Sequence, residues 1–326
     1  MNENCRAVAL GFFDGVHRGH AALLERVKER AAELNASPAV LTFDVHPDTL
    51  VFGKEVPLIN SAPEREEIIR RIYGIDTTIF LHFNRRMMEM PWQEFIESAV
   101  RELGITAVVV GHDFSFGYRG QGTPERLQAW CAERNIRCDV IPAVKIDGRI
   151  VSSTEIRSLI ADGKIEEANR LLGHPHTLSD VIHAGFHLGA KLGSPTINMA
   201  FPAGVVIPKH GVYAARVWLD DGSDYAAVTN IGVRPTVSEG EHVSVESHLL
   251  DFSGNLYGRH ARVEFMHFQR AERRLTRWRN WPNRSGATPR KREPGSGRPV
   301  TRTNKNKPVG RPACKAVRKE TWRRRS

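Results

Sequence analysis

The sequence is poor in cysteine and has no long apolar run. Its 326 residues include four cysteines, Cys5, Cys131, Cys138 and Cys314. They show no CxxC spacing, so neither a disulfide framework nor a cysteine zinc site is indicated. The apolar run nearest the N-terminus, residues 7–13, is too short for a membrane span and lacks the cleavage region of a signal peptide. We therefore expect a cytoplasmic protein with free thiols.

Positive charge is concentrated at one end of the chain. Residues 273–326 hold 19 Lys and Arg against 2 acidic residues and carry +17, whereas the rest holds 28 basic and 35 acidic residues and carries −7. The mildly acidic body gives no reason to expect a nucleic-acid partner. The basic segment lacks apolar periodicity, which predicts a disordered tail. Its alternative role is non-specific binding of nucleic acid by counterion release.

Short β-rich runs alternate with helical patterns over residues 6–150. Helical spacing is found at 21–34, 92–103 and 124–133. The strand-like runs between them are "RAVALGFF", "PAVLTFDVHP", "TTIFLHF", "ITAVVVG" and "IRCDVIPAV". This alternation predicts an α/β fold with a mostly parallel sheet and helices on both faces. Ligands of such sheets bind beyond the carboxyl ends of the strands.

The pattern changes after residue 174. Strand-like runs follow one another with Gly, Pro and Asp between them, as in "GVYAARVWL", "DYAAVTNIG", "VSVESHLLDF" and "HARVEFMHF". They predict an antiparallel barrel or sandwich. A helical stretch over 153–173 joins the two parts. We therefore predict domains at residues 1–173 and 174–272, followed by the tail at 273–326.

Two histidines, His17 and His20, lie in "GFFDGVHRGH" between the first strand and the first helix. A helix N-terminus offers unpaired N–H groups and a favourable field for anions. The glycines allow close approach of the backbone, and imidazoles add hydrogen-bond donors. The segment therefore predicts a phosphate site. A metal-binding pair or ordinary surface histidines are the open alternatives.

A second polar segment is "VSSTEIR" at residues 151–157. Its three hydroxyls precede Arg157 at a predicted helix start, which favours a second phosphate-binding element. The alternative is a simple N-cap by Ser153 or Thr154 with an incidental arginine. Asp113, in "GHDFSFG", is a weaker candidate for a nucleotide or flavin contact, and a structural Asx turn is its alternative.

Together these segments resemble the nucleotidyltransferases that transfer adenylyl groups from ATP. With "LTFDVHP" and "VVVGHDFSFG", residues 6–173 resemble the adenylyltransferase half of the bacterial bifunctional riboflavin kinase/FMN adenylyltransferase family. The resemblance implies a Rossmann-like domain in which His17, His20 and Arg157 act on the triphosphate. It also implies nucleotide or flavin contacts from Gly11, Phe13, Asp14, Gly15, Gly19, Asp113, Ser152, Ser153 and Thr154.

A glycine-rich segment, "GFHLGAKLGSPTIN", begins the second part of the chain. Gly185, Gly189 and Gly193 precede two oxygen donors, Thr196 and Asn198. Such a loop followed by hard oxygen ligands suits a nucleotide with Mg²⁺. An ordinary loop and turn is the alternative.

This segment resembles the riboflavin kinase domain of the same family, whose signature is GFPTAN. The runs "IPKHGVYAARV", "VTNIGVRPTV" and "VESHLLDFSGNLYG" extend the resemblance over residues 174–272. It implies an antiparallel β-barrel, with Glu246 as the general base and Mg²⁺ near Thr196 and Asn198. A carboxylate of this kind accepts the proton of the ribityl hydroxyl as ATP donates its γ-phosphate.

The implied function is synthesis of flavin cofactors from small molecules. Riboflavin would be phosphorylated by ATP to FMN, and FMN would be adenylylated to FAD with release of pyrophosphate. The alternative is an FMN adenylyltransferase alone, because the sequence leaves the family pattern after "FQRAERRL". The family continues there with a leucine-rich amphipathic helix. We interpret the change as translation in another reading frame, and we expect weak kinase activity beside better preserved adenylyl transfer.

Overall fold

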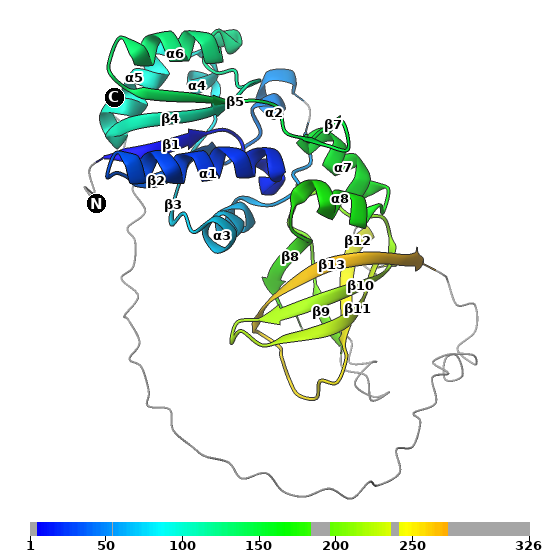
Figure 1. Ribbon diagram of the computed structural model, residues 1–326. Coiled ribbons are helices and arrows are strands. Elements are labelled where there is room, and N and C mark those ends of the chain that lie inside the picture. Colours follow the sequence, from blue (N-terminus) through cyan, green and yellow to red (C-terminus); the bar gives the residue numbers. More distant parts are fainter. Residues whose placement is uncertain (1–4, 54, 184–195, 236–240, 273–326) are drawn as a thin grey trace, which may run out of the picture. The chain divides into compact units, whose positions relative to one another are not determined.

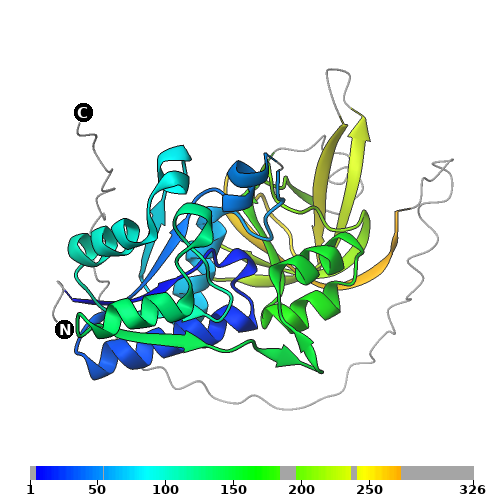
Figure 2. The same cartoon turned by 90° about the horizontal axis from the view of Figure 1, so that it is seen from above.

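Two sheets organise the chain in the computed structural model, which describes residues 5–53, 55–183, 196–235 and 241–272 (Figure 1). The colour bar traces the five-stranded parallel sheet from blue to green and the six-stranded antiparallel sheet from green to orange (Figure 2). Within these ranges no helix has the length and apolar character needed to cross a bilayer. Cys5, Cys131 and Cys138 are free thiols, and the predicted tail lies outside the described residues.

The first sheet is parallel, with the strand order β3-β2-β1-β4-β5. Its bounds are β1 (Arg6–Leu10), β2 (Ser37–Phe43), β3 (Thr77–Leu81), β4 (Ile105–Gly111) and β5 (Arg137–Ile141). Successive residues of β1 face opposite sides: Ala9 joins a core cluster with Leu24 of α1 and Ile69 of α3, while Val8 packs with α5 and α6. The predicted α/β fold with helices on both faces is therefore confirmed.

Helices of different lengths surround this sheet. They are η1 (Asp14–Val16), α1 (Arg18–Glu33), α2 (Pro47–Phe52), α3 (Ala62–Tyr73), α4 (Arg85–Glu89), α5 (Trp92–Leu103), η2 (Tyr118–Gly120) and α6 (Pro124–Ala132). Helix α3 was not predicted, although Ser61 and Glu64 form a capping box at its start. The single helical stretch predicted over 153–173 is two helices, α7 (Ser153–Ala161) and α8 (Ile165–Leu172), which are separated at Gly163 with a φ of 79°.

The second sheet is antiparallel, with the order β8-β13-β10-β11-β12-β9. Its bounds are β8 (His176–Val181), β9 (Thr196–Met199), β10 (Gly211–Leu219), β11 (Asp224–Pro235), β12 (Glu241–Leu249) and β13 (His260–Ala271), and a separate hairpin joins β6 (Lys145–Ile146) to β7 (Arg149–Ile150). An antiparallel bridge between His183 and Asn198 joins the two edges of the sheet. The predicted β-barrel is therefore confirmed.

The helices α7 and α8 pack against the barrel. Ile156 and Leu172 belong to the same apolar cluster as Leu178 of β8 and Phe265 of β13. Asn169 of α8 donates to the carbonyl oxygen of Phe265 at 2.8 Å and accepts the N–H of His176 at 2.7 Å. These contacts fix where the chain leaves α8 and enters β8.

Candidate functional site

The first candidate site lies where the strand order of the parallel sheet reverses. Strands β1 and β4 are neighbours, and connections leave their carboxyl ends toward opposite edges of the sheet. In α/β proteins, ligands bind beyond the carboxyl ends of the strands at such a reversal. The turn at residues 11–17 follows β1, and Asp113 follows β4. The Asp113 side chain is 82% exposed and lies 3.8 Å from Nδ1 of His112.

The turn after β1 has a backbone that requires glycine. Gly15 has a φ of 75°, and a Cβ there would lie 2.8 Å from Cδ1 of Ile59. At Gly19 a Cβ would lie 3.0 Å from two atoms of the His17 ring. Phe13, also in the left-handed region with a φ of 57°, is fully buried. Gly11, at the start of the turn, donates its N–H to Leu41 O at 3.3 Å.

His17 and His20 form a stacked pair at the start of α1. Their ring centroids are 3.7 Å apart with an interplanar angle of 13°, and the Phe13 ring packs 5.0 Å from that of His20. His17 is the N-cap, because its Nδ1 accepts the backbone N–H of His20 at 3.3 Å. A neutral imidazole whose Nδ1 accepts carries its proton on Nε2. His17 therefore has one N–H to offer a ligand.

Burial keeps both histidines neutral near pH 7. It lowers the pKa of His17 to about 4, and with His17 and Arg65 nearby it lowers the pKa of His20 well below its ordinary value. Nδ1 of His20 is buried and has no hydrogen-bond partner among the described residues. The two histidines would therefore offer an anion N–H donors and no positive charge, and the N-terminus of α1 adds its own N–H groups.

Asp14 connects this turn to α7. Its buried carboxylate accepts the N–H of Ile59 at 2.8 Å, and its Oδ2 lies 3.5 Å from Nε of Arg157. Burial raises the Asp14 pKa to about 6, although the Ile59 hydrogen bond and the Arg157 charge oppose this rise. Ser153 Oγ donates to the carbonyl oxygen of Asp14 at 3.0 Å. Residues 139 positions apart in the sequence therefore meet at one turn.

The three hydroxyls of the second segment have different surroundings. Ser152 is the N-cap of α7, because its side chain accepts the N–H of Glu155 at 3.3 Å. The prediction that Ser153 or Thr154 is the cap is therefore wrong: Ser153 binds the Asp14 carbonyl, and Thr154 is exposed. Helix α7 is capped, as the alternative interpretation required, and Arg157 still lies beside Asp14.

Sequence reasoning missed Arg65, a fully buried arginine beside the turn. Its guanidinium donates to the carbonyl oxygens of Phe12 at 2.5 Å and Phe43 at 2.9 Å, and lies 4.5 Å from the centroid of the Phe12 ring. It thereby ties the end of β1 to the end of β2. The ring of His46 also packs against Phe12, at 4.6 Å. The capping box of α3 was an available signal for the helix, but not for the burial of Arg65.

The second candidate site lies on the strand pair β9 and β12. Glu246 is directly opposite Asn198 in the register, and His248 is opposite Thr196. Directly opposite residues of an antiparallel pair share a face. Their neighbours Ile197, Val245 and Ser247 are buried, so this face points away from the barrel interior. Gly185, Gly189 and Gly193 of the predicted loop lie outside the described residues.

Comparisons with known proteins agree with this arrangement. The FAD synthetase family model matches residues 1–155, and the riboflavin kinase family model matches residues 172–280. Proteins described as bifunctional riboflavin kinase/FMN adenylyltransferase are 32% identical in Listeria monocytogenes, covering 82% of this chain and 85% of the relative, and 36% identical in Pseudomonas fluorescens, with the same coverage. The Escherichia coli K12 relative is 34% identical, and the match covers 84% of this chain and 87% of the relative.

A solved structure is also similar. It is a crystal structure described as a macrolide-efflux protein from Streptococcus pneumoniae, with a TM-score of 0.74 and 26% sequence identity. The match covers 86% of this chain and 90% of that one.

A Rossmann-like nucleotidyltransferase region joined to a riboflavin kinase barrel defines an ATP-dependent transferase of flavin cofactor synthesis. The chain belongs to the bifunctional riboflavin kinase/FMN adenylyltransferase family. Its activities are phosphorylation of riboflavin to FMN and adenylylation of FMN to FAD. Because the kinase model matches the barrel, the alternative of an adenylyltransferase alone is not favoured.

Proposed function

We propose that the two reactions use separate ATP sites, one for each sheet. The adenylyl-transfer site consists of the turn at residues 11–20 with Ser153 and Arg157 of α7. The kinase site consists of Glu246, Thr196 and Asn198 on β12 and β9. The observation that carries the first assignment is the meeting of Asp14, Ser153 and Arg157 beside the histidine pair. The second depends on the register that sets Glu246 opposite Asn198.

Adenylyl transfer requires mainly alignment of two anions. The phosphate of FMN is already a nucleophile at neutral pH, and it attacks the α-phosphorus as pyrophosphate leaves. Nε2–H of His17 and the start of α1 would donate to the triphosphate, and Arg157 would stabilise the charge that develops on the leaving group. In the described structure Arg157 lies against Asp14, so the carboxylate keeps the guanidinium at the turn. Further proposed contacts of the nucleotide or the flavin are Gly11, Gly19, Ser152, Thr154 and Asp113.

Phosphorylation of riboflavin requires a base. The ribityl hydroxyl is a poor nucleophile, and the Glu246 carboxylate would accept its proton while the γ-phosphate is transferred. Glu246 is at the middle of a paired strand, with Asn230 opposite on one side and Asn198 on the other. A base held in this way has little freedom to leave the reacting hydroxyl.

Mg²⁺ fits the donor set of the kinase site. Thr196 and Asn198 supply a hydroxyl and an amide oxygen two residues apart on one strand face. Magnesium typically has few protein ligands and is completed by water and phosphate oxygens. When bound, the ion would neutralise charge on the ATP phosphates.

The test is a chromatographic assay of riboflavin, FMN and FAD with Mg-ATP, using wild type and N198A. Wild type is expected to convert riboflavin to FMN and then to FAD. N198A should require about tenfold more Mg²⁺ for half-maximal kinase rate, since loss of a metal contact typically costs about tenfold or more. Adenylylation of FMN by the same variant is the internal control and should keep its Mg²⁺ dependence. An unchanged Mg²⁺ dependence of the kinase would contradict the metal assignment.

The remaining proposals concern the compartment in which the protein works and its binding partners. Both reactions consume ATP, which supports the cytoplasm as the working compartment and small molecules as the partners. A disordered tail at residues 273–326 stays the prediction, with non-specific binding of nucleic acid as its alternative, because that segment lies outside the described residues.

A further inference from the structure

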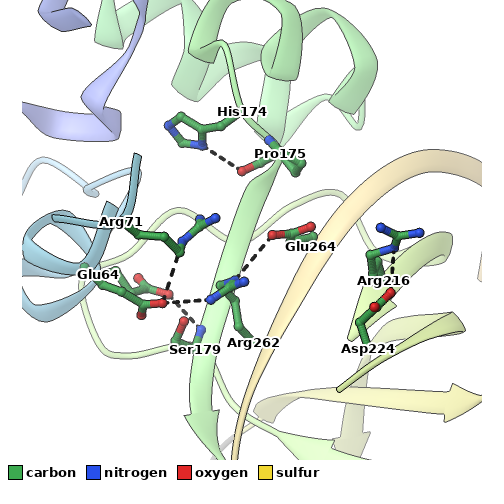
Figure 3. Close-up of polar contacts among 10 residues, drawn as sticks. Glu64, Arg71, His174, Pro175, Ser179, Arg216, Asp224, Arg262 and Glu264 are labelled. Atoms are coloured by element: carbon green, nitrogen blue, oxygen red, sulfur yellow. Dashed lines mark hydrogen bonds and ion pairs between the residues drawn. The ribbon is translucent and has the colours of Figure 1, made fainter. Parts of the chain in front are cut away.

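His174 is the residue between α8 and β8 that contacts the glycine turn. Its Nε2 lies 3.1 Å from the carbonyl oxygen of Gly15. Its Nδ1 lies 2.8 Å from the carbonyl oxygen of Pro175, and Figure 3 shows this second contact. Only 7% of the residue is exposed. A carbonyl oxygen accepts hydrogen bonds and never donates them, and a neutral imidazole has one N–H, so the ring donates to only one of these two carbonyls. The tautomer that carries its proton on Nε2 donates to Gly15, and it is this form that would act on the turn.

The two peptide groups on either side of Gly15 are both held by distant segments. Ser153 Oγ donates to the carbonyl oxygen of Asp14, and the His174 ring contacts that of Gly15. In a planar trans peptide the C=O and N–H point in opposite directions, so fixing each carbonyl fixes the N–H that follows it. Glycine at a positive φ does not restrict these peptide planes by itself. Inside the turn, the N–H of Val16 also donates to the carbonyl oxygen of Phe13 at 3.1 Å. The orientation of the turn therefore depends on this bond and on its two external partners.

The residues just before His174 pack against the start of α1 and the glycine turn. Arg18, at the start of α1, donates from Nε to the carbonyl oxygen of Arg170 at 2.9 Å. A Cβ at Gly173 would lie 3.0 Å from Cγ of Arg18, so the end of α8 packs closely on the start of α1. A Cβ at Gly15 would likewise lie 3.1 Å from Cδ2 of Leu172. Residues 170–174 thus contact the turn and the start of α1, which belong to the proposed ATP site.

We propose that His174 is a positioning residue for adenylyl transfer, which holds the Gly15 peptide so that the turn places His17 and the start of α1 for the triphosphate. The inference rests on the proposed ATP site at residues 11–20. It extends that site to the segment that leads into the first strand of the kinase barrel. ATP affinity of the first site then depends on how this segment enters β8.

The test compares H174L, which fills much of the ring volume without a donor, with H174Q, whose amide N–H replaces Nε2–H. At saturating FMN, H174L should raise KM for ATP about five- to tenfold, which corresponds to one hydrogen bond of ordinary strength. H174Q should stay within about twofold of wild type. The control H267L removes an exposed histidine that contacts Glu166 of α8. This variant should keep the wild-type KM for ATP. Riboflavin phosphorylation by H174L should equal that of wild type.

A second measurement does not depend on turnover. Hydrogen–deuterium exchange of a peptide covering residues 11–20 should be faster in H174L than in H174Q, because only the glutamine still holds the Gly15 carbonyl. Equal KM values and equal exchange in the two variants would overturn the proposal. A parallel fall of both kinase and adenylylation rates would also overturn it, by assigning His174 to overall stability. H17N marks the ATP site: if H17N also leaves KM for ATP unchanged, the proposed site itself is wrong.

Discussion

The two candidate sites differ in how their residues are brought together. The adenylyl-transfer site gathers a turn after β1, a helix 139 residues further on and a histidine before β8, and several of its polar groups are buried. The kinase site is a pair of adjacent strands whose outward face carries Glu246 and Asn198. The first depends on tertiary packing and on the cost of buried charge. The second depends chiefly on strand register.

The largest effect is expected at the kinase base. E246Q keeps the shape of the side chain but cannot accept the ribityl proton, so kcat for riboflavin phosphorylation should fall about 10²- to 10⁴-fold. Adenylylation of FMN by the same protein should be unchanged, because the ATP site proposed for that reaction does not include Glu246. The measurement is product formation from riboflavin and from FMN in parallel. A matching loss of both activities would remove the distinction between the sites.

The next effect concerns Arg157. R157Q should lower the rate of FMN adenylylation about 10²-fold, through loss of transition-state charge stabilisation, with riboflavin phosphorylation preserved. It should also lower the free energy of unfolding by about 2 kcal/mol, because Asp14 is left buried without its cation. The double variant D14N/R157Q should regain that stability without regaining activity. Recovery of activity in the double variant would show that Arg157 acts only on Asp14.

A third prediction uses the raised pKa of Asp14. With a folded pKa of about 6 against an ordinary 3.8, its protonated form favours the folded state, and this contribution is present below pH 4 and lost as the pH rises through 6. D14N mimics the protonated form and should be more stable than wild type at pH 7, by up to about 3 kcal/mol. Urea unfolding at pH 7 and pH 4 should show the difference shrinking at the lower pH. An equal difference at both values would mean that Asp14 does not titrate in this window.

The smallest effect is expected for an ion pair that joins helix α3 to strand β13 of the barrel. Arg262 of β13 binds Glu67 of α3 at 2.8 Å and Glu264 at 3.3 Å, while Glu64 accepts the N–H of Ser179 (Figure 3). Arg262 and Glu67 side chains are 16% and 32% exposed, so a double-mutant cycle with R262A and E67A should give a coupling of about 0.5–1 kcal/mol. Both activities should persist in each variant at 25 °C. A coupling near zero would indicate that the Arg262–Glu67 ion pair does not stabilise the contact between barrel and helix.

Local patterns predicted most of the elements. Helix α5 spans the predicted residues 92–103, while α1 begins at Arg18, three residues before its predicted start, because His17 caps it. The break between α7 and α8 was not predicted, since the apolar spacing continues through Gly163. Helix α3 was missed although its capping box was visible in the sequence.

The sequence by itself determined the local placement of the candidate site residues, because turn glycines, cap positions and strand alternation depend on neighbours in the chain. The stacked histidines and the outward face of β12 follow from such short-range rules. Only the tertiary structure decided that Arg157 pairs with Asp14, that Arg65 is buried against Phe12 and that His174 contacts Gly15. These contacts join residues far apart in the sequence. They exist because packing the helices onto the two sheets removes the intervening water, so most buried polar groups are stable only beside a partner within the protein.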